Sequence, residues 1–215
     1  MEKGSATLGD DARGEIPNIG VLISGRGSNL QALIDAIDAG SLRARIAIVI
    51  SNRDGAAGVD RARAAGIETL TLSHRSFVDR DAFDMELAAE LKARNVRLVC
   101  LAGFMRLIGQ RLLDAFPNGI LNIHPSLLPA FPGVDAQAQA IAHGVKISGV
   151  TVHLVNRDLD AGPIVLQSAV PVRPDDTPDT LAARILLEEH RLYPEAVRIV
   201  LSGGWRLEGR RFLTY

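Results

Sequence analysis

The feature that most constrains the fold of this chain is an alternation of short apolar runs with helical patterns along its N-terminal half. The runs at 18–24, 44–51 and 96–103 are nearly continuous in Val, Ile and Leu, which is typical of strands covered on both faces. Segments between them, such as 28–40 and 80–95, repeat apolar residues every three or four positions, as amphipathic helices do. This alternation predicts an α/β fold with a parallel, doubly wound sheet.

The pattern changes in the C-terminal part. Apolar runs at 148–155 and 163–172 are joined by a short turn, so we expect an antiparallel strand pair there. Segment 179–204 predicts a long C-terminal helix with Pro194 near its middle, and the last residues form a hairpin or a loose tail. Further strands are expected at 68–72 and 119–125, and further helices at 55–66, 107–116 and 135–144. The predicted fold class is α/β, with a mostly parallel sheet, an antiparallel C-terminal strand pair and a long C-terminal helix.

Composition limits the classes of protein to which the chain can belong. With 215 residues, 47% of them hydrophobic, we expect a single domain at 18–215, preceded by a disordered tail at 1–17. The net charge of -1 gives no global attraction for nucleic acid or an anionic membrane. The single cysteine, Cys100, excludes a disulfide framework and a cysteine-rich metal site. No apolar run is long enough to cross a bilayer and no apolar signal region is present, so we expect a cytoplasmic protein.

The loop from Ser24 to Asn29 (SGRGSN) leads from a strand into a helix. Its two glycines allow the backbone to approach a ligand closely, the helix N-terminus offers unpaired N–H groups, and Arg26 adds a positive charge. It is not a nicotinamide-type fingerprint, since Leu30 stands at the third glycine position, and no Gly-Lys-Ser/Thr follows as in a P-loop. The loop therefore predicts either a phosphate or carboxylate site, or a tight turn capped by Ser28.

A second group of polar residues ends the strand at 119–125. Asn122 and His124 are two residues apart, so both side chains point to one side of the strand. Pro125 closes the strand, and ligands of parallel sheets bind beyond the carboxyl ends of strands. An amide beside an imidazole suits a developing oxyanion that needs a hydrogen bond and a proton. The pair thus predicts a catalytic site, with two satisfied core polar residues as the alternative.

A third group lies in the turn NRDLDAGPI, where Asp158 and Asp160 separate two apolar strands. A carboxylate there could orient or charge an imidazole, although spacing alone does not choose between the two. His153 either supports the site or packs. A metal site from His124, His153 and an aspartate is conceivable, but no closely spaced ligand pair supports it, so no metal is expected. Ser126 lacks the context of a nucleophile elbow, which argues against a serine hydrolase.

Several motifs carry a resemblance that spans about residues 18 to 200. They are LISGRGSNLQALIDA, LAGFMRLIG, LNIHPSLLPAFPG, GVTVHLVNRDLDAGPIVLQ and EEHRLYP. Together they resemble the folate-dependent formyltransferase family, and the SGRGSN loop narrows the resemblance to the glycinamide ribonucleotide formyltransferases. The resemblance implies a Rossmann-like fold and formyl transfer from 10-formyltetrahydrofolate to the amine of 5'-phosphoribosylglycinamide in purine biosynthesis. It implies these two small molecules as substrates, no metal, no nucleic acid or membrane partner, and a possible homodimer.

The same resemblance assigns roles to individual residues. The catalytic residues of the family fall on Asn122, His124 and Asp160, which selects Asp160 over Asp158. Residues implied to bind the ribonucleotide are Gly25, Arg26, Gly27, Ser28, Asn29 and Glu189. Residues implied to bind the folate are Arg80, Met105, Arg106, Leu107, Asn122 and Val155. The chain departs from the family pattern at Gly119, Asp135 and Gln137, where relatives commonly carry a basic residue or a histidine.

Two other functions of the family are alternatives, of which a formyltetrahydrofolate hydrolase would use the same three catalytic residues. A formyltetrahydrofolate hydrolase lets water attack, but such relatives carry an N-terminal regulatory domain that 17 residues cannot form. A methionyl-tRNA formyltransferase needs an added RNA-binding domain and a basic surface, which a net charge of -1 does not provide. A binding protein without catalysis has no use for the Asn-His-Asp set. We therefore expect the ribonucleotide formyltransferase, with the hydrolase as the alternative.

Overall fold

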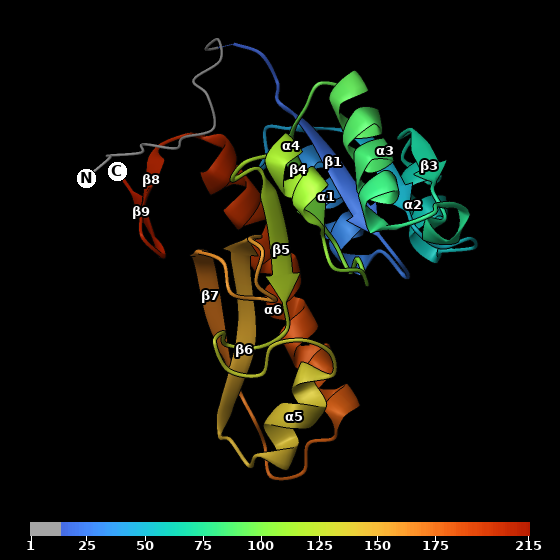
Figure 1. Cartoon of the computed structure of the whole chain (residues 1–215). Coiled ribbons are helices and arrows are strands. Elements are labelled where there is room, and N and C mark those ends of the chain that lie inside the picture. The colour runs from blue at the N-terminus through green and yellow to red at the C-terminus, as the bar shows by residue number, and fades with distance from the viewer. Residues whose placement is uncertain (1–13) are drawn as a thin grey trace.

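A computed structural model describes residues 14–215, so most of the predicted tail at 1–17 lies outside the described residues. The described chain forms one nine-stranded sheet flanked by helices (Figure 1). The strands are β1 (Asn18–Ile23), β2 (Arg45–Ser51), β3 (Thr69–Thr71), β4 (Val96–Leu101), β5 (Ile120–His124), β6 (Ile147–Leu154), β7 (Ile164–Pro171), β8 (Trp205–Glu208) and β9 (Arg211–Thr214). The helices are α1 (Ser28–Asp38), α2 (Ala57–Ala64), η1 (His74–Ser76), α3 (Arg80–Ala93), α4 (Gln110–Ala115), α5 (Ala136–Ala142) and α6 (Pro178–Leu201).

The sheet has a parallel half and a largely antiparallel half that meet at β5. The strand order is β3-β2-β1-β4-β5-β6-β7-β9-β8. Strands β1 to β5 pair in parallel, whereas β6 runs antiparallel to both β5 and β7. This confirms the predicted fold class, including the C-terminal strand pair and the long C-terminal helix.

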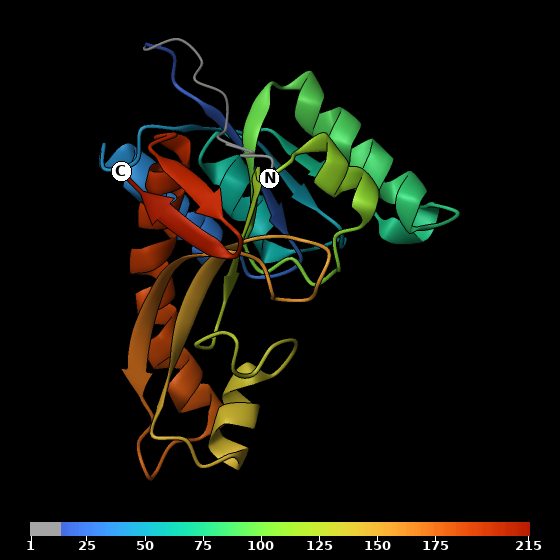
Figure 2. The same cartoon turned by 60° about the vertical axis from the view of Figure 1, so that its left-hand side comes forward.

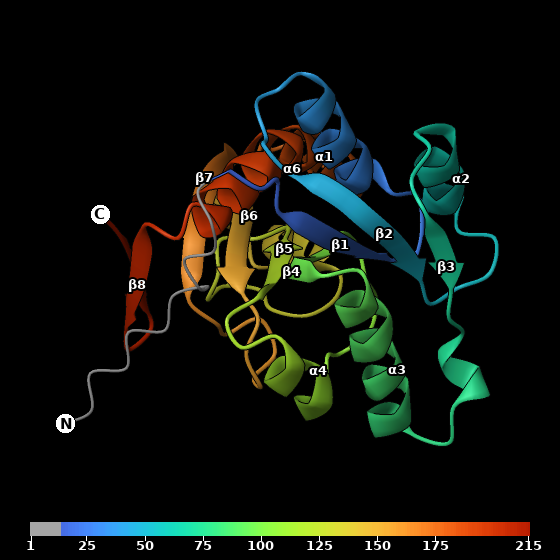
Figure 3. The same ribbon diagram turned by 90° about the horizontal axis from the view of Figure 1, so that it is seen from above.

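Helices cover both faces of the parallel half, which is why its strands are apolar on both sides. Neighbouring residues of β1 point into different cores, Val21 into one and Leu22 into the other, as the strand pleat requires. Seen from above, α1 and α6 lie over one face, and α3 and α4 lie over the other (Figure 3). Two apolar cores therefore hold the sheet rigidly between the helices.

Helix α6 spans 24 residues and includes Pro194. Its start is fixed by Thr177, which caps the helix, and by Pro178 in the first turn, where a missing N–H costs nothing. Tyr193 is fully buried, and its hydroxyl lies 2.9 Å and 3.1 Å from the carbonyl oxygens of Leu101 and Leu121. The helix is thereby fixed against Leu101 at the end of β4 and Leu121 near the start of β5, one turn beyond Glu189.

Several predicted boundaries needed correction. The expected cap of α1 by the Ser28 side chain is wrong, because Gly27 is the N-cap and Ser28 is already helical, with no side-chain cap bond. Helix α4 begins at Gln110 rather than at residue 107. The C-terminal residues form the hairpin β8–β9 (Figure 2). The rings of Trp205 and Phe212 stack within it, with their centres 4.8 Å apart. Within residues 14–215, no helix combines the length and the apolar character needed to cross a membrane.

Candidate active site

Three loops meet where the neighbouring strands β1, β4 and β5 end. They are 24–29 after β1, 102–109 after β4, and the segment after His124, the last residue of β5. Because parallel strands present their carboxyl ends at one edge of the sheet, these loops lie beside one another. The glycine-rich loop, the segment Met105–Leu107 and the end of β5 with His124 are therefore brought to a single edge.

The glycine-rich loop is packed tightly between β1 and α2. Gly27 has φ 72°, and a Cβ there would lie 2.6 Å from the Cα of Gly58. The Gly58 N–H donates to the Gly25 carbonyl at 2.9 Å, and Arg61 donates through Nε to the Arg26 carbonyl at 2.9 Å. Only glycine fits position 27 without strain. The first N–H groups of an α-helix have no partner within the helix, and such groups bind anions.

Asn29 and Glu189 form a buried polar pair beside this loop. Asn29 Nδ2 donates to Glu189 Oε2 at 2.6 Å, joining α1 to α6 across 160 positions of sequence. Burial raises the pKa of Glu189, against smaller opposing effects of the Asn29 hydrogen bond and the Arg26 charge. Asn29 Oδ1 is buried without a hydrogen-bond partner. A pair of this kind can bind hydroxyl groups, which both donate and accept.

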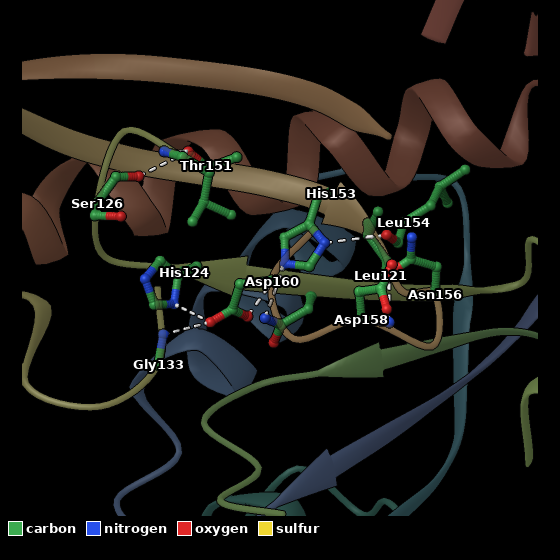
Figure 4. Close-up of polar contacts among 12 residues, drawn as sticks. Leu121, His124, Ser126, Gly133, Thr151, His153, Leu154, Asn156, Asp158 and Asp160 are labelled. Carbon is green, nitrogen blue, oxygen red and sulfur yellow. Dashed lines mark hydrogen bonds and ion pairs between the residues drawn. The ribbon is translucent and has the colours of Figure 1, made fainter. Parts of the chain in front are cut away.

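Asp160 lies between the two imidazoles of His124 and His153 (Figure 4). Its Oδ2 is 3.4 Å from His124 Nδ1, and its Oδ1 is 3.6 Å from His153 Nε2. The Gly133 N–H donates to Oδ2 at 2.7 Å. Asn122 Nδ2 lies 3.2 Å from His153 Nε2. The structure thus brings Asn122, His124 and Asp160 together, with His153 between the amide and the carboxylate.

The polar neighbours of Asp160 decide the ionisation of its carboxyl group. Burial raises its pKa, but the contact with His153, the Gly133 N–H bond and the charge of His124 outweigh it, so the net pKa is below the ordinary value. Asp160 is consequently a carboxylate at neutral pH. His124 also contacts the Phe131 carbonyl through Nε2 at 2.8 Å, so both ring nitrogens face acceptors. A ring nitrogen that carries a proton can donate to the acceptor that it faces.

Asp158 does not belong to this cluster. It is exposed, and its backbone N–H donates to Asn156 Oδ1 at 3.2 Å. The sequence left open whether Asp158 or Asp160 contacts an imidazole, and in the structure Asp160 is the one of the two that does. Val155 donates its N–H to the Ile120 carbonyl at 2.9 Å, which fixes the start of the turn beside β5.

His153 is the residue whose position sequence reasoning left undecided. It lies directly opposite Asn122 in the antiparallel β5–β6 register. Its Nδ1 donates to the Leu154 carbonyl at 3.0 Å, which leaves Nε2 toward Asn122 and Asp160. The signal in the sequence was that Thr151 and His153 are two residues apart, so both side chains lie on one face of β6. In the β5–β6 pairing they stand opposite His124 and Asn122.

Four of the six residues implied to bind the folate lie in the neighbouring loop or at the start of α3, whereas Asn122 lies in β5 and Val155 follows β6. Met105 and Leu107 are exposed, Arg80 is exposed, and the Arg106 guanidinium lies 5.2 Å from the Phe83 ring centre. Asp84 is buried beneath them and accepts the Gly109 N–H at 2.7 Å. This region therefore combines exposed apolar side chains with two cations, as a flat ring with an anionic tail requires.

The departures from the family pattern lie outside the cluster around Asp160. Gly119 precedes β5, at the opposite end of that strand from His124. Asp135, with φ 54°, and Gln137 lie at the start of α5, and Asp135 makes no capping bond through its side chain. Among residues 14–215, no group of three or more His, Cys, Asp or Glu side chains is arranged to hold a metal ion.

Known proteins resemble the chain over most of its length. The family model described as Formyl transferase matches residues 17–197. Phosphoribosylglycinamide formyltransferase of Escherichia coli is 44% identical over 193 residues, covering 90% of this chain and 88% of that protein. The trifunctional purine biosynthetic protein adenosine-3 of Bos taurus is 48% identical over 189 residues, but the match spans only 19% of its length. The crystal structure of glycinamide ribonucleotide transformylase 1 from Symbiobacterium toebii superposes with TM-score 0.92 at 54% identity, covering 94% of this chain and 95% of that one.

Proposed function

Because this chain belongs to the formyl transferase family, we propose that it transfers a formyl group from 10-formyltetrahydrofolate to the amine of 5'-phosphoribosylglycinamide. This reaction is a step of de novo purine biosynthesis. The observation that carries the proposal is the juxtaposition, at one sheet edge, of an anion-binding loop and the Asn122–His124–Asp160 cluster. The first suits a substrate phosphate, and the second suits an acyl-transfer oxyanion.

The acceptor is held, in this proposal, by the loop Gly25–Asn29 and by Glu189. The N–H groups at the start of α1 bind the phosphate, helped by the positive end of the helix dipole. The Asn29–Glu189 pair then meets the ribose hydroxyls, because Asn29 Oδ1 has an acceptor position to spare. The phosphate and the ribose together orient the acceptor amine toward the end of β5.

The donor is held by the loop Met105–Leu107 and by Arg80, with Asn122 and Val155 at the reacting end. The apolar side chains at this edge fit a flat ring, and Arg80 and Arg106 fit the carboxylates of a glutamate tail. When bound, the folate supplies a formyl group on a nitrogen that can leave. The protein supplies the position and the charge.

Asn122 and His124 stabilise the reaction at the formyl oxygen. As the acceptor nitrogen bonds to the formyl carbon, that oxygen becomes negative, and the Asn122 amide and the His124 imidazolium donate to it. The Asp160 carboxylate lies 3.4 Å from His124 Nδ1 on one side of the ring, and Nε2 on the other side turns from the Phe131 carbonyl to the oxyanion. The amine then loses a proton as the bond from the formyl carbon to the folate nitrogen breaks, and that nitrogen receives it through the Asp160 cluster.

One assay tests the proposal and separates it from the hydrolase. The purified chain is incubated with 10-formyltetrahydrofolate, with and without 5'-phosphoribosylglycinamide, while tetrahydrofolate release and the formylated acceptor are followed. Release that requires the acceptor, with equal formation of the product, is the expected result. Release without acceptor identifies a hydrolase, and no release in either case contradicts both functions. The dephosphorylated acceptor serves as a control and should react far more slowly, because it lacks the group that the loop binds.

Location and assembly follow from this role as further proposals. Purine nucleotides are made in the cytoplasm, so we place the protein there. A homodimer is proposed from the resemblance alone, and sedimentation of the purified chain at several concentrations tests it.

A further inference from the structure

Ser24 lies at the junction of the loops that serve the two proposed substrates. It follows the last residue of β1, directly before Gly25, and is 5% exposed. Its backbone N–H donates to the Gly103 carbonyl at 3.1 Å. The acceptor loop continues from Ser24 along the chain, and the donor loop, residues 102–109, meets Ser24 through Gly103 and Met105.

The Ser24 hydroxyl makes two hydrogen bonds whose directions are fixed. It donates to Asn52 Oδ1 at 2.6 Å and accepts the Met105 N–H at 2.8 Å. A hydroxyl has one proton, so donation to Asn52 turns its lone pairs toward Met105. Asn52 is itself 2% exposed, and its backbone N–H bonds to the Ile23 carbonyl at 3.4 Å. Asn52 thus orients the Ser24 hydroxyl, and this hydroxyl in turn binds the Met105 N–H of the donor loop.

We propose that Ser24 is a positioning residue that couples acceptor binding to donor binding. The inference rests on the proposed function, since it assigns the two substrates to the two loops. An anion bound at 25–29 fixes the backbone that begins at Ser24, and Ser24 fixes Met105 in the donor loop. The bond to Asn52 is buried, the bond from Met105 is partly buried, and Ser24 itself is 5% exposed, so its hydroxyl acts through Met105 rather than by touching a substrate. Coupling of this kind is reciprocal, so each substrate tightens the binding of the other.

A purely structural Ser24 would behave differently. If its hydroxyl only holds β1 to its neighbours, removing it lowers the melting temperature and leaves the two substrates as coupled as before. The discriminating quantity is therefore the ratio of the donor-side dissociation constants measured without and with the acceptor. That ratio does not depend on the overall stability of the fold.

The test is calorimetric titration of tetrahydrofolate, which has no formyl group to transfer, in the absence and presence of saturating 5'-phosphoribosylglycinamide. For the unmodified chain we expect the acceptor to tighten tetrahydrofolate binding about fivefold or more. Ser24→Ala should reduce this factor to within about twofold of unity. The turnover number should fall with it, because Met105 is no longer held, while the KM for the acceptor changes less.

Ser148→Ala is the matched control. Ser148 is also buried, at 1% exposure, but its hydroxyl has no hydrogen-bond partner, and it lies in β6 away from both loops. It should leave the coupling factor unchanged. Should Ser24→Ala fail to fold, Asn52→Ala replaces it, since the hydroxyl then loses its fixed orientation, and an intermediate coupling factor is expected.

The outcomes separate this inference from the proposed function. Formyl transfer by the unmodified chain is measured in parallel, and its absence overturns the function. Transfer without measurable coupling between tetrahydrofolate and the acceptor overturns the inference alone. So does full coupling in Ser24→Ala, or in Asn52→Ala if only that variant folds.

Discussion

The carboxyl group of Asp160 links the chemistry of the site to the stability of the fold. Its folded pKa is lowered below the ordinary value of 3.8, because the effects of His153, Gly133 and His124 exceed that of burial. A depressed carboxyl pKa contributes stability that is present above the unfolded value and is lost as pH falls through the folded value. The imidazoles and the Gly133 N–H therefore stabilise the fold only while Asp160 is charged.

Asp160→Asn should remove this contribution. At pH 7 the variant should unfold at a lower urea concentration than the unmodified chain. The difference between the two unfolding midpoints should become smaller as pH falls below about 4. Urea titrations of both proteins across this range measure it. A gap that stays constant with pH would mean that the Asp160 charge does not contribute. Asp158→Asn is the control, because the exposed neighbour contacts neither imidazole.

His124 and Asp160 should also act as one catalytic unit. His124→Ala and Asp160→Asn are each expected to lower the turnover number by at least about 100-fold, the size of effect seen when one oxyanion donor is removed. The double variant should be little worse than the poorer single one, because residues of one unit are non-additive. Steady-state kinetics of the three variants decides this. If the loss of turnover in the double variant equals the product of the two single losses, the two residues act independently.

At the scale of whole elements, contacts between distant parts of the chain explain why helices α1 and α4 start where the sequence did not predict. Helix α4 starts at Gln110 because the Gly109 N–H is bound by Asp84, so residues 107–109 stay out of the helix. The periodicity of 107–116 could not reveal a partner 25 positions away. Gly27 likewise replaces Ser28 at the cap because of its contact with Gly58. Local patterns located the elements, whereas tertiary contacts set their ends.

Gly27→Ala tests the acceptor loop. The new Cβ would lie 2.6 Å from the Gly58 Cα, and the φ of 72° is unfavourable for alanine. We expect the KM for the ribonucleotide to rise at least about tenfold, with little change in the KM for the folate. Gly40→Ala is the matched control, because Gly40 also has φ 72° but nothing within 4 Å. Both variants carry backbone strain of about 1–2 kcal/mol, so equal kinetic effects would contradict the assignment of the loop.

Arg80→Ala tests the donor side of the site. Arg80 begins α3, beside Gly109 and the buried Asp84. Loss of its charge should raise the KM for a folate with a glutamate tail and leave the KM for the ribonucleotide nearly unchanged. Arg63→Ala, an exposed arginine on α2, should alter neither. A folate that lacks the glutamate should not distinguish Arg80→Ala from the unmodified chain, and a difference there would argue against pairing with the tail.

At the scale of the whole molecule, most of the architecture could be predicted, but the assembly of the site could not. The alternation of apolar runs and helices indicated the parallel sheet, and the three polar groups were found by residue type and position. The sequence did not say that β6 would pair with β5 in the register that places His153 opposite Asn122. Nor could spacing choose between Asp158 and Asp160, because that choice depends on the path of the turn after β6.

The described residues should unfold as one unit. A single domain at 18–215 is our prediction. The sheet runs without interruption from β3 to β8. Tyr193 of α6 also bonds to Leu101 of β4 and Leu121 of β5, which ties the helix to the middle of the sheet. Scanning calorimetry should therefore show one transition whose calorimetric and van't Hoff enthalpies agree. Two transitions would mean that the parallel and antiparallel halves unfold separately.

The meeting of the two halves at β5 has a consequence for how the protein is made. Synthesis proceeds from the N-terminus, so the ribosome releases β1 to β5, with the loop 24–29 and His124, before β6 exists. His153 and Asp160 come from segments that can take their places only after β6 has paired with β5. A nascent chain that ends before residue 147 would thus carry the glycine-rich loop and His124 without the neighbouring carboxylate of Asp160. The proposed catalytic site is therefore completed late in translation, after β6 of the antiparallel half has paired with β5.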